Sequence, residues 1–566
     1  MPELNLSNKT EKKLTRLETG GLPLIHWVIK RLRLYEILAA HIPAHGNEII
    51  SAVDSLLLIL YNITLGRQPL YELEQWTKGI NPRGLGCLDI AHGHLNDDRF
   101  GRALDKLYWA DRSSLMTEIV MKVVEEFNLD ISRIHNDSTT IKAFGRIPGK
   151  TRTGLELKKG NSKDHRPDLK QLVYCLSISA DGAVPIHHKA YAGNRTDDTT
   201  HIETWNTIRK IVKKTDFLYV ADCKVCTNKQ LFHIVDKGGR VVTIIPETWG
   251  EVEHFKDELR SKIKARKKIW RRKIQPRPID YPKYEYFSLF SGKYNTKQRY
   301  RIHWIYSNEK KQRDHLSRME ALLNTEKALL EINSRINTRK LKTREQIDDE
   351  IKKVVKKFKT KSFLKIQVRQ STEKWKVQIG RGRPGSHTKY RVKTNTIYVL
   401  IWSRDLRAIK KEQRIDGIFP LLSTDEKLTA KEALMAYKYQ PKLEKRFNQF
   451  KSVHNGAPLL FKKIERVEST MFVFFLALII QALIEREVRK KMLELEIESL
   501  DIYPECRDAY HPTTTKILSN FEGLSIYKIM KGKKIVEEYK DTLTDTQKTI
   551  LKLLEIEPAQ YWNPET

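Results

Sequence analysis

The stretch from residue 131 to residue 245 constrains the fold more than any other part of the chain. Its hydrophobic pattern changes in the order strand, strand, strand, helix, strand, helix, strand. The continuous apolar run over 217–220 is typical of a strand that is buried on both faces. Asp181-Gly182 predicts a tight turn between the second and third strands. The order therefore predicts a mixed α/β sheet with flanking helices. The expected strands are 131–143, 172–178, 184–190, 217–220 and 241–245, and the expected helices are 199–213 and 228–235.

The segments on either side of this stretch follow other patterns. Residues 20–130 repeat apolar side chains at spacings of three and four and show no strand pattern, which predicts an all-helical N-terminal domain. Residues 246–415 contain a basic run, a long amphipathic helix over 307–336 and several period-two stretches. They predict an inserted α+β domain with a basic helix and a small sheet. A strand pattern over 417–422 then returns the chain to the first sheet.

The charge of the chain indicates a polyanionic partner. Lys and Arg number 104 against 70 Asp and Glu, a formal net charge of +34, which exceeds what solubility requires. The alternative is a ribosome-associated or merely basic protein. The run over 260–273 contains nine Lys and Arg and no acid. Arg266, Lys267 and Lys268 in this run are predicted to contact DNA, although a solvated helix face would have the same composition.

Cysteine usage and hydropathy exclude other classes of protein. Five cysteines form no disulfide framework, and the single Cys223-x2-Cys226 pair does not predict a structural zinc. We expect reduced thiols in a cytoplasmic protein. No signal peptide is visible. The longest apolar run, 471–484, is shorter than the roughly 20 residues that span a bilayer, so it predicts a buried helix and no membrane partner.

Two aspartates lie where the predicted strands offer sites for chemistry. Asp137 lies within a strand, in the polar run His135-Asn136-Asp137-Ser138-Thr139-Thr140. A carboxylate there is costly unless something pairs with it, and a metal ion would do so. Asp222 directly follows the buried strand of residues 217–220, where functional groups collect in parallel sheets. The alternatives are that both residues only cap local backbone.

Glu444 lies in a helical pattern with an unusual polar stripe. At 100° per residue, Tyr437, Gln440, Glu444 and Lys451 share a stripe about 60° wide. Such a stripe is not a core stripe. It is either a solvated face with an ion pair or a metal ligand flanked by phosphate-binding groups. Pro441 either kinks this helix or begins its second half.

Together these three segments resemble the DDE transposases of bacterial insertion sequences. The resemblance rests on the order Asp, Asp, Glu and on a Y-x2-R-x3-E-x6-K-like helix, in which Gln440 stands where Arg is usual. Residues 162–171 and 193–197 also resemble segments of one branch of this family. The family implies an RNase H-like core that is interrupted between the second Asp and the Glu.

The resemblance also implies the chemistry and the partners. Two Mg²⁺ ions, for which Mn²⁺ substitutes, would activate water and later a 3′-hydroxyl, and would stabilise the leaving oxygen. The implied ligands and catalytic residues are Asp137, Asp222 and Glu444. The residues implied to position phosphates are Tyr437, Gln440 and Lys451. The implied function is terminal-inverted-repeat binding, DNA cleavage and strand transfer by a homodimer on DNA, in the prokaryotic cytoplasm at the nucleoid.

On this interpretation the chain divides into five regions. They are a DNA-end-binding helical domain over 1–130, the first part of the core over 131–245, the insertion over 246–415, the second part of the core over 416–490, and a C-terminal region over 491–566 that serves oligomerisation. Two alternatives stay open. One is a metal-dependent nuclease of similar fold without strand transfer, and the other is a non-catalytic DNA-binding protein.

Three minor features complete the prediction. Residues 145–151 are one residue short of a phosphate-binding loop and lead into no apolar helix, so NTP hydrolysis is not expected. Arg381-Gly382-Arg383-Pro384 predicts a turn between strands, with a minor-groove-binding peptide as the alternative. Four glutamates near the apolar run are rivals of Glu444. Local ion pairs are expected to explain Glu485 and Glu487. A place at the start of the apolar helix, where acids are favoured, is expected to explain Glu465 and Glu468.

Overall fold

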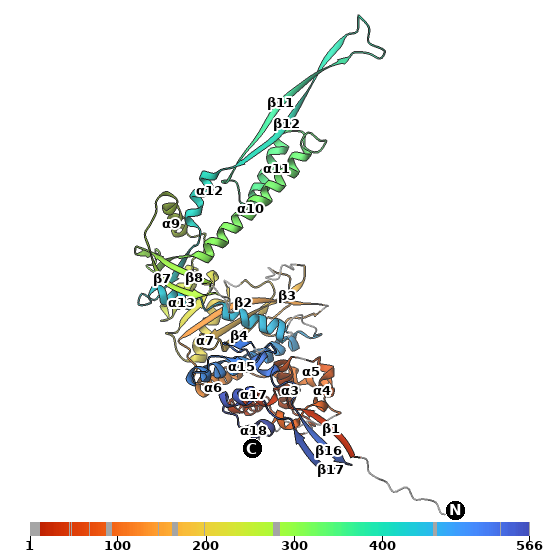
Figure 1. Cartoon of the computed structure of the whole chain (residues 1–566), viewed down its shortest axis with the longest axis vertical. Helices are drawn as coiled ribbons and strands as arrows, with labels where there is room; N and C mark the ends of the chain where they lie inside the picture. Colours follow the sequence, from red (N-terminus) through yellow and green to blue (C-terminus); the bar gives the residue numbers. More distant parts are fainter. Residues whose placement is uncertain are drawn as a thin grey trace, which may run out of the picture. The chain divides into compact units, whose positions relative to one another are not determined.

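The computed structural model describes residues 12–564 except 45, 47, 67, 87–92, 145–146, 161–167, 197–198, 275–282, 455, 457–460, 506 and 533. The chain forms two compact units (Figure 1). Unit 1 combines residues 1–243 with residues 434–566, and unit 2 is the continuous segment 244–433. Most of the segment 162–171, part of 145–151, and Cys87 and Cys506 lie outside the described residues.

Unit 1 contains the sheet that the sequence predicts. Its strands lie in the order β4-β3-β2-β5-β6, with β2, β3 and β4 antiparallel and with β2, β5 and β6 parallel. The strands are β2 (Arg133–Ala143), β3 (Lys170–Ser179), β4 (Pro185–Ala192), β5 (Leu218–Ala221) and β6 (Arg240–Ile244). The helices α7 (His201–Val212) and α8 (Asn228–Asp236) connect them where expected. The predicted order of strands and helices over 131–245 is therefore confirmed.

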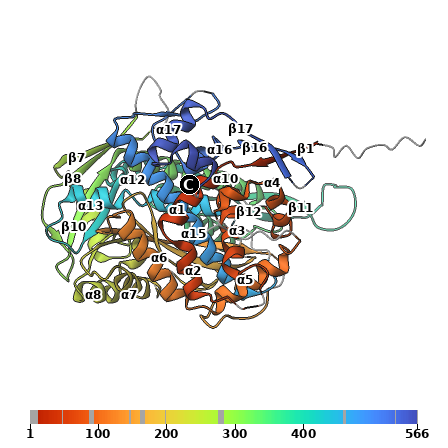
Figure 2. The same cartoon turned by 90° about the horizontal axis from the view of Figure 1, so that it is seen from below.

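A long apolar helix, α15 (Ile464–Glu494), forms the core of the helical part of unit 1. It packs against α1 (Leu22–Arg31), α3 (Ala52–Leu65) and α5 (Asp97–Trp109), and it also contacts β4 (Figure 2). Among the described residues it is the one helix long and apolar enough to cross a membrane, and 94% of its most apolar window is buried inside the structure. The expectation of a buried helix over 471–484 is confirmed.

The remaining helices of unit 1 follow the apolar periodicity of the sequence. The apolar face of α6 lies inside, for example at Leu115, Ile119 and Val123. The other elements that precede the sheet are α2 (Leu34–His41), α4 (Leu73–Gly79) and α6 (Arg112–Glu126). Those in the C-terminal part are α13 (Ala430–Tyr437), which begins at the end of unit 2, α14 (Pro441–Asn448), α16 (Thr514–Ser519), α17 (Asp545–Leu553) and α18 (Pro558–Trp562), with the short strands β14 (Leu500–Asp501) and β15 (Asp508–Ala509).

The N-terminal region is not purely helical, which corrects the sequence prediction. β1 (Lys12–Glu18) pairs antiparallel with β16 (Ser525–Lys531), which in turn pairs with β17 (Lys534–Lys540). The sequence of β1 does not alternate between apolar and polar residues. Its strand conformation comes from a partner about 510 residues later in the chain, as in the pair Glu18–Ser525. Local patterns cannot reveal such a pairing.

Unit 2 contains both helices and strands, and its residues 244–433 include the segment 246–415 for which the sequence predicts an α+β domain. Its strands lie in the order β13-β10-β8-β7 with β9 on β10, and a second, two-stranded sheet joins β11 and β12. The strands are β7 (Arg266–Lys273), β8 (Tyr284–Phe290), β9 (Tyr294–Asn295), β10 (Arg301–Ser307), β11 (Leu364–Gln378), β12 (Tyr390–Arg404) and β13 (Ile418–Ser423). The helices are α9 (Gly250–Ser261), α10 (Asn308–Arg335), α11 (Arg344–Lys357) and α12 (Leu406–Glu412).

The basic run over 260–273 is mostly a strand and not a helix, which is a second correction. α9 ends at Ser261, and Arg266–Lys273 forms β7, which pairs antiparallel with β8. Trp270 of β7 stacks on Phe287 of β8 at 5.1 Å between ring centroids. This cross-strand packing favours the strand, while the basic side chains at the edge of the sheet keep their charged ends in water.

Candidate active site

The parallel pairing of β2 with β5 brings the two predicted aspartates together. Asn136 pairs with Ala221, so Asp137 and Asp222 are the next residues along two adjacent parallel strands. Neighbouring strands are about 4.8 Å apart, and residues at equivalent positions point to the same face. The register therefore brings the backbones of both aspartates next to each other at the end of β5.

The end of β5 explains why an aspartate is tolerated within β2. β5 stops at Ala221, whereas β2 continues to Ala143 with β3 on its other side. Asp137 therefore lies where β2 loses one of its two neighbours, and its side chain is only partly buried. Its Oδ1 accepts a hydrogen bond from Ser138 N at 2.7 Å.

Asp222 lies at the start of a short 3-10 turn. Its Oδ1 accepts a hydrogen bond from Lys224 N at 3.0 Å, and its side chain is 39% exposed. Asp222 therefore does cap local backbone, which was the alternative interpretation of this residue. The cap occupies one carboxylate oxygen and leaves the side chain open to solvent.

Gln440 ties the Glu444 helix to the strand that carries Asp137. Its Nε2 donates to Asn136 O at 3.0 Å, and its Oε1 lies 3.1 Å from His135 Nδ1. His135 and Asp137 are two residues apart, so they share a face of β2. The helix that carries Glu444 therefore packs on the face of β2 to which Asp137 belongs.

This contact gives Gln440 a different task from the phosphate contact that the sequence suggested. Its side chain is only 9% exposed, and both ends of its amide are used inside the protein. A buried amide whose two ends are both bonded within the protein positions other residues and does not reach a ligand. Glutamine is uncharged and can both donate and accept hydrogen bonds. At position 440, where the motif that the sequence resembles has Arg, it is therefore suited to a buried contact with a backbone carbonyl and an imidazole.

The polar stripe of the sequence is divided among three helical segments. α13 ends at Tyr437, and α14 begins with Pro441 in its first turn. Of the two expectations for Pro441, a kink or the start of a second helix, the structure has the second. Glu444 lies in the first turn of α14 and is exposed. Lys451 lies in a π-helical turn, Gln449–Val453, which is closed by a bond from His454 N to Gln449 O at 3.0 Å. A π turn has more residues than an α turn, so Lys451 is rotated from the position that an uninterrupted α-helix would give it.

The pKa of the Tyr437 hydroxyl reflects the negative charge around the site. Burial raises the pKa of its hydroxyl to about 12, and the negative charges of Asp222, Asp137 and Glu444 add to this increase. All three carboxylates are therefore close enough to the same phenol to oppose its ionisation. Tyr437 is a neutral hydrogen-bonding group at neutral pH, which suits a contact with an anion.

Sequence reasoning missed a buried polar network behind the aspartates. His201, on α7, places Nε2 at 3.9 Å from Asp222 Oδ1 and Nδ1 at 3.0 Å from the hydroxyl of Tyr219. Asn136 accepts a hydrogen bond from Ser177 Oγ at 2.8 Å and lies 3.5 Å from His201 Nδ1. The signal for His201 was its position four residues before Trp205, on the apolar face of the predicted helix.

The donor set has the chemistry of a magnesium site but not its spacing. Three carboxylates supply the oxygen ligands that Mg²⁺ prefers. Within the described part of the chain, however, no group of three or more His, Cys, Asp and Glu side chains lies close enough together to hold a metal ion. The three carboxylates therefore do not form a preformed ligand cluster among the described residues.

The rival glutamates have partners of their own. Glu485 forms an ion pair with Arg446 at 2.9 Å, Glu487 pairs with Arg486, and Glu468 pairs with Arg112 at 2.7 Å. Glu465 lies in the first turn of α15. The local ion pairs expected for Glu485 and Glu487 are present, since Glu485 also lies 3.7 Å from Arg489. The charge of Glu444, by contrast, contributes to the raised pKa of Tyr437.

The predicted DNA contacts of the basic run belong to unit 2. Arg266, Lys267 and Lys268 are exposed on β7. Arg266 lies over the ring of Tyr306 at 3.6 Å from the centroid, and Lys268 lies 5.4 Å from that of Tyr286. The charged ends of Arg266 and Lys268 thus lie over aromatic rings on an exposed sheet edge, where cations can contact phosphates.

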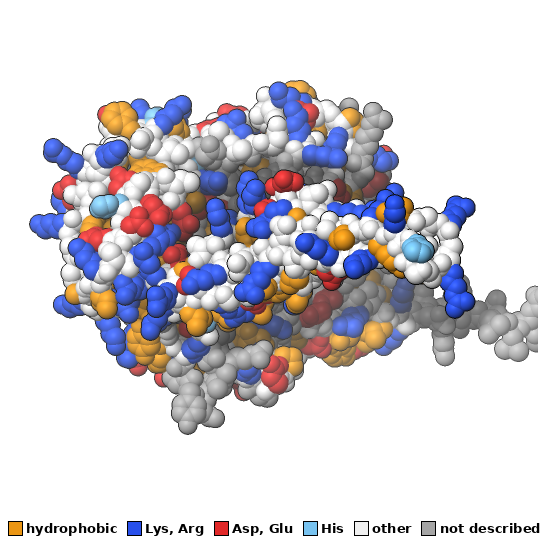
Figure 3. All heavy atoms as spheres, turned by 90° about the horizontal axis from the view of Figure 1, so that it is seen from above, with side chains coloured by type: hydrophobic (Ala, Val, Ile, Leu, Met, Phe, Trp, Pro, Cys, Tyr) orange, Lys and Arg blue, Asp and Glu red, His pale blue; other side chains and the backbone are white. Residues whose placement is uncertain are grey.

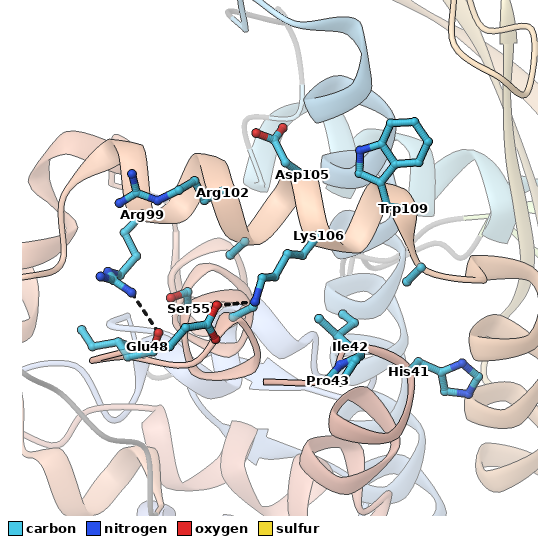
Figure 4. Close-up of a pocket in the computed structure, with 14 residues that line it drawn as sticks. His41, Ile42, Pro43, Glu48, Ser55, Arg99, Arg102, Asp105, Lys106 and Trp109 are labelled. Carbon is cyan, nitrogen blue, oxygen red and sulfur yellow. Dashed lines mark hydrogen bonds and ion pairs between the residues drawn. The ribbon is translucent and has the colours of Figure 1, made fainter. Parts of the chain in front are cut away.

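A cavity of about 640 Å³ in unit 1 is separate from these residues (Figure 4). It lies beside α3 and α5, and its lining includes His41, Arg99 and Trp109. Glu48 pairs with Lys106 across it, and Arg99 donates to Ile50 O at 2.9 Å. The charged groups of this cavity thus bond to the protein, and none of the candidate site residues lines it.

Comparison with known proteins gives a match to one family model and a distant similarity to solved structures. A family model described as a domain of unknown function, DUF4277, matches residues 14–121. No curated protein matches the chain. Among solved structures, the piggyBac transposase synaptic complex with hairpin DNA is similar at 8% identity and a TM-score of 0.34, covering 90% of this chain and 81% of that chain. All candidate site residues lie outside the region that the family model matches.

Proposed function

We propose that this chain is a metal-dependent DNA transposase that cleaves the ends of an insertion sequence and joins them to target DNA. The observation that carries the proposal is the register of β2 with β5, which makes Asp137 and Asp222 the next residues along two adjacent chain segments. Gln440 links the Glu444 helix to the strand that carries Asp137. The net charge of +34 supports DNA as the substrate.

The three carboxylates are the proposed metal ligands. Asp137, Asp222 and Glu444 would hold Mg²⁺, which supplies charge stabilisation to a phosphodiester under attack by water or by a 3′-hydroxyl. Since the described residues contain no preformed ligand cluster, binding would require Glu444 and the aspartates to approach one another. Catalytic contacts that are loose without substrate commonly tighten in the complex.

The surrounding residues would orient this site. Tyr437 stays protonated to pH values near its pKa of about 12, so its hydroxyl can donate to a phosphate oxygen. Lys451 is proposed to contribute positive charge to the same DNA backbone. Gln440 and His201 are proposed as positioning residues, one for the Glu444 helix and the other for Asp222.

The test is cleavage of a duplex that carries the inverted repeat flanking the gene, with Mg²⁺ and with Mn²⁺. Asp137→Asn, Asp222→Asn and Glu444→Gln remove one charge each with little change of shape. We expect each to abolish cleavage and joining while binding to the same duplex stays near the wild-type value. Asp216→Asn and Glu426→Gln, at exposed acids away from the site, are matched controls that should cleave normally.

The outcomes separate the proposal from its alternatives. Near wild-type cleavage by any one of the three variants would show that its carboxylate is misassigned. Cleavage without joining of the 3′ end to target DNA would indicate a nuclease without strand transfer. Binding without metal-dependent nicking by the wild-type chain would indicate a non-catalytic DNA-binding protein.

A further inference from the structure

The two longest strands of unit 2 form a ribbon whose outer half has no packing partner in the described structure. β11 and β12 pair antiparallel without interruption from Leu364–Arg404 to Gln378–Tyr390. In Figure 1 the ribbon continues beyond the ends of α10 and α11. Residues 371–396 are exposed at every position except 377, 378 and 388. An isolated pair of strands is only marginally stable in water, so this part of the ribbon is suited to acting against a partner.

The base of the ribbon, by contrast, is firmly held. Leu364, Val368 and Leu400 are buried in a hydrophobic cluster with α10 and α11. Asn337 accepts from Tyr398 N at 2.8 Å and donates to Tyr398 O at 2.9 Å. These contacts fix the direction of the ribbon relative to the helices of unit 2. The outer half is thus a projecting arm on a rigid base.

The arm carries unpaired positive charge. Between residues 371 and 397 there are seven Lys and Arg and one acid, Glu373. Four of the cations lie on the strands at Lys374, Lys376, Arg391 and Lys393, Lys389 directly precedes β12, and the other two lie at the tip. None of the seven forms an ion pair with another described residue.

Two cations at the base of the ribbon, in contrast to those of the arm, have acidic partners. Arg404 bonds both oxygens of Glu326 at 2.7 Å, and Lys365 lies 3.5 Å from Asp405. In Figure 3, which looks down on this end of unit 2, Lys and Arg side chains project on both sides of the ribbon. The charge therefore favours a polyanion along the arm.

At the tip of the arm, two arginines lie beside glycines, which carry no side chains. Gly380 and Gly382 have φ values of +104° and +133°, a conformation that favours glycine, and a Cβ on either would contact nothing within 4 Å. Gln378 Nε2 donates to Gly382 O at 3.0 Å, which holds the turn. Arg381 and Arg383 flank Gly382 and are exposed. The predicted turn is confirmed, and its shape leaves both guanidinium groups on a narrow, projecting loop.

We propose that this arm binds double-stranded DNA and that Arg381 and Arg383 enter the minor groove at A·T-rich sequence. The B-DNA minor groove is about 6 Å wide and narrower in A-tracts, where its negative potential attracts Arg. A backbone without side chains at 380 and 382 suits so narrow a space. The strands of the arm, about 25 Å long from 371 to 378, would place their lysines and arginines along the flanking phosphates.

Two other partners fit the arm less well. A second copy of the chain would bring like charges together, which disfavours pairing of two arms. Double-stranded RNA has a wide, shallow minor groove, in which a narrow arginine loop would make few contacts. This inference shares the DNA partner with the proposed function but involves neither the candidate active site nor cleavage, so a binding experiment without metal tests it by itself.

The experiment measures binding of the full chain, in a metal chelator, to three duplexes of equal length that lack the inverted repeat. One contains only A·T pairs, one only G·C pairs and one only I·C pairs. Inosine removes the minor-groove amino group of guanine and leaves the major-groove acceptors in place. We expect the wild-type chain to bind the A·T and I·C duplexes about tenfold more tightly than the G·C duplex.

Variants at the tip connect this preference to the arm. Arg381→Ala with Arg383→Ala should weaken binding to the A·T duplex about tenfold and abolish the preference. Arg381→Lys with Arg383→Lys keeps the charge and should also lose most of the preference, because lysine is the more strongly hydrated cation. Lys352→Ala with Lys356→Ala, on the exposed face of α11, is the control that should keep it. An unchanged melting temperature would show that all three fold.

Each contrary outcome has a distinct meaning. A tip variant that binds like the wild type, or a wild type that distinguishes A·T from G·C but not I·C from G·C, would overturn the minor-groove assignment and leave the proposed function intact. A wild-type chain that binds no DNA would overturn both. Loss of self-association in the tip variant, with DNA binding unchanged, would assign the arm to a second copy of the chain.

Discussion

At the scale of single residues, the site depends on buried amides and imidazoles as much as on its carboxylates. Gln440 bonds to Asn136 O and to His135, so one side chain links the Glu444 helix to the strand of Asp137. Asn136 in turn is held by Ser177 on the next strand. Such groups are costly to leave unpaired in a protein interior. The geometry of the site is therefore sensitive to substitutions that touch no ligand.

Gln440→Met keeps the volume of the side chain but removes both hydrogen bonds. We expect the free energy of unfolding to fall by about 1–3 kcal/mol, because a carbonyl and an imidazole nitrogen lose their partner. We also expect DNA cleavage to fall at least about tenfold with little change in DNA binding. A displaced Glu444 helix impairs the cleavage reaction more than it impairs the contact between protein and DNA. Chemical denaturation and the cleavage assay measure the two effects. Gln312→Met, on an exposed face of α10, is the control, and normal cleavage by Gln440→Met would refute the positioning role.

Buried histidines should make the protein sensitive to acid. Burial lowers the pKa of both His135 and His187 to about 4, against a usual value of 6.5. Between these values the unfolded chain binds more protons, so stability falls as the pH falls from about 6.5 towards 4. Each histidine should account for about 2 kcal/mol between pH 7 and pH 5. His135→Gln should flatten the pH dependence of the free energy of unfolding, whereas His254→Gln, at an exposed histidine, should not.

At the scale of elements, strand ends and helix breaks decide where functional groups lie. β5 stops one residue before Asp222, and that early end opens the edge of β2 at Asp137. Pro441 starts α14, and a π turn follows it at Gln449–Val453. The Glu444 segment is therefore short and is directed by its contacts with β2. In unit 2, β7 is a sheet edge that carries exposed cations.

The exposed cations of β7 give a prediction about salt dependence. Arg266→Ala, Lys267→Ala and Lys268→Ala together should weaken DNA binding by a similar factor on all sequences, because phosphate contacts carry no sequence information. The slope of log K against log salt should become shallower by roughly 0.9 for each phosphate contact that is lost. Titrations at several salt concentrations measure this slope. A slope equal to that of the wild type would mean that β7 faces solvent in the complex.

At the scale of the whole molecule, the two ends of the chain fold together. β1 pairs with β16, and the hydroxyl of Tyr561 donates to Gly20 O at 2.9 Å. Thr514 N donates to Glu485 on α15 at 3.1 Å. The C-terminal region, which the sequence assigned to oligomerisation, is therefore part of the same compact unit as the N-terminal helices.

A chain that ends at Glu494 should fail to fold as a stable unit. It would leave β1 without a partner and would expose the apolar side chains that α16 and α17 cover. We expect loss of soluble protein or of cooperative thermal unfolding, measured by circular dichroism. Tyr561→Phe, which removes one buried hydrogen bond, should cost only about 1 kcal/mol. A truncated chain that is folded and monomeric would instead support an oligomerisation role.

The sequence by itself determined the local elements and the chemistry that they offer. The apolar run before Asp222, the turn at Asp181-Gly182 and the amphipathic helices are local patterns, and the structure has the corresponding elements. Only the tertiary structure decided which distant residues meet. The register of β2 with β5, the bond from Gln440 to Asn136 and the pairing of β1 with β16 join residues about 85, 304 and 510 positions apart. Such pairings depend on packing and hydrogen-bond satisfaction across the whole fold, which no local periodicity encodes.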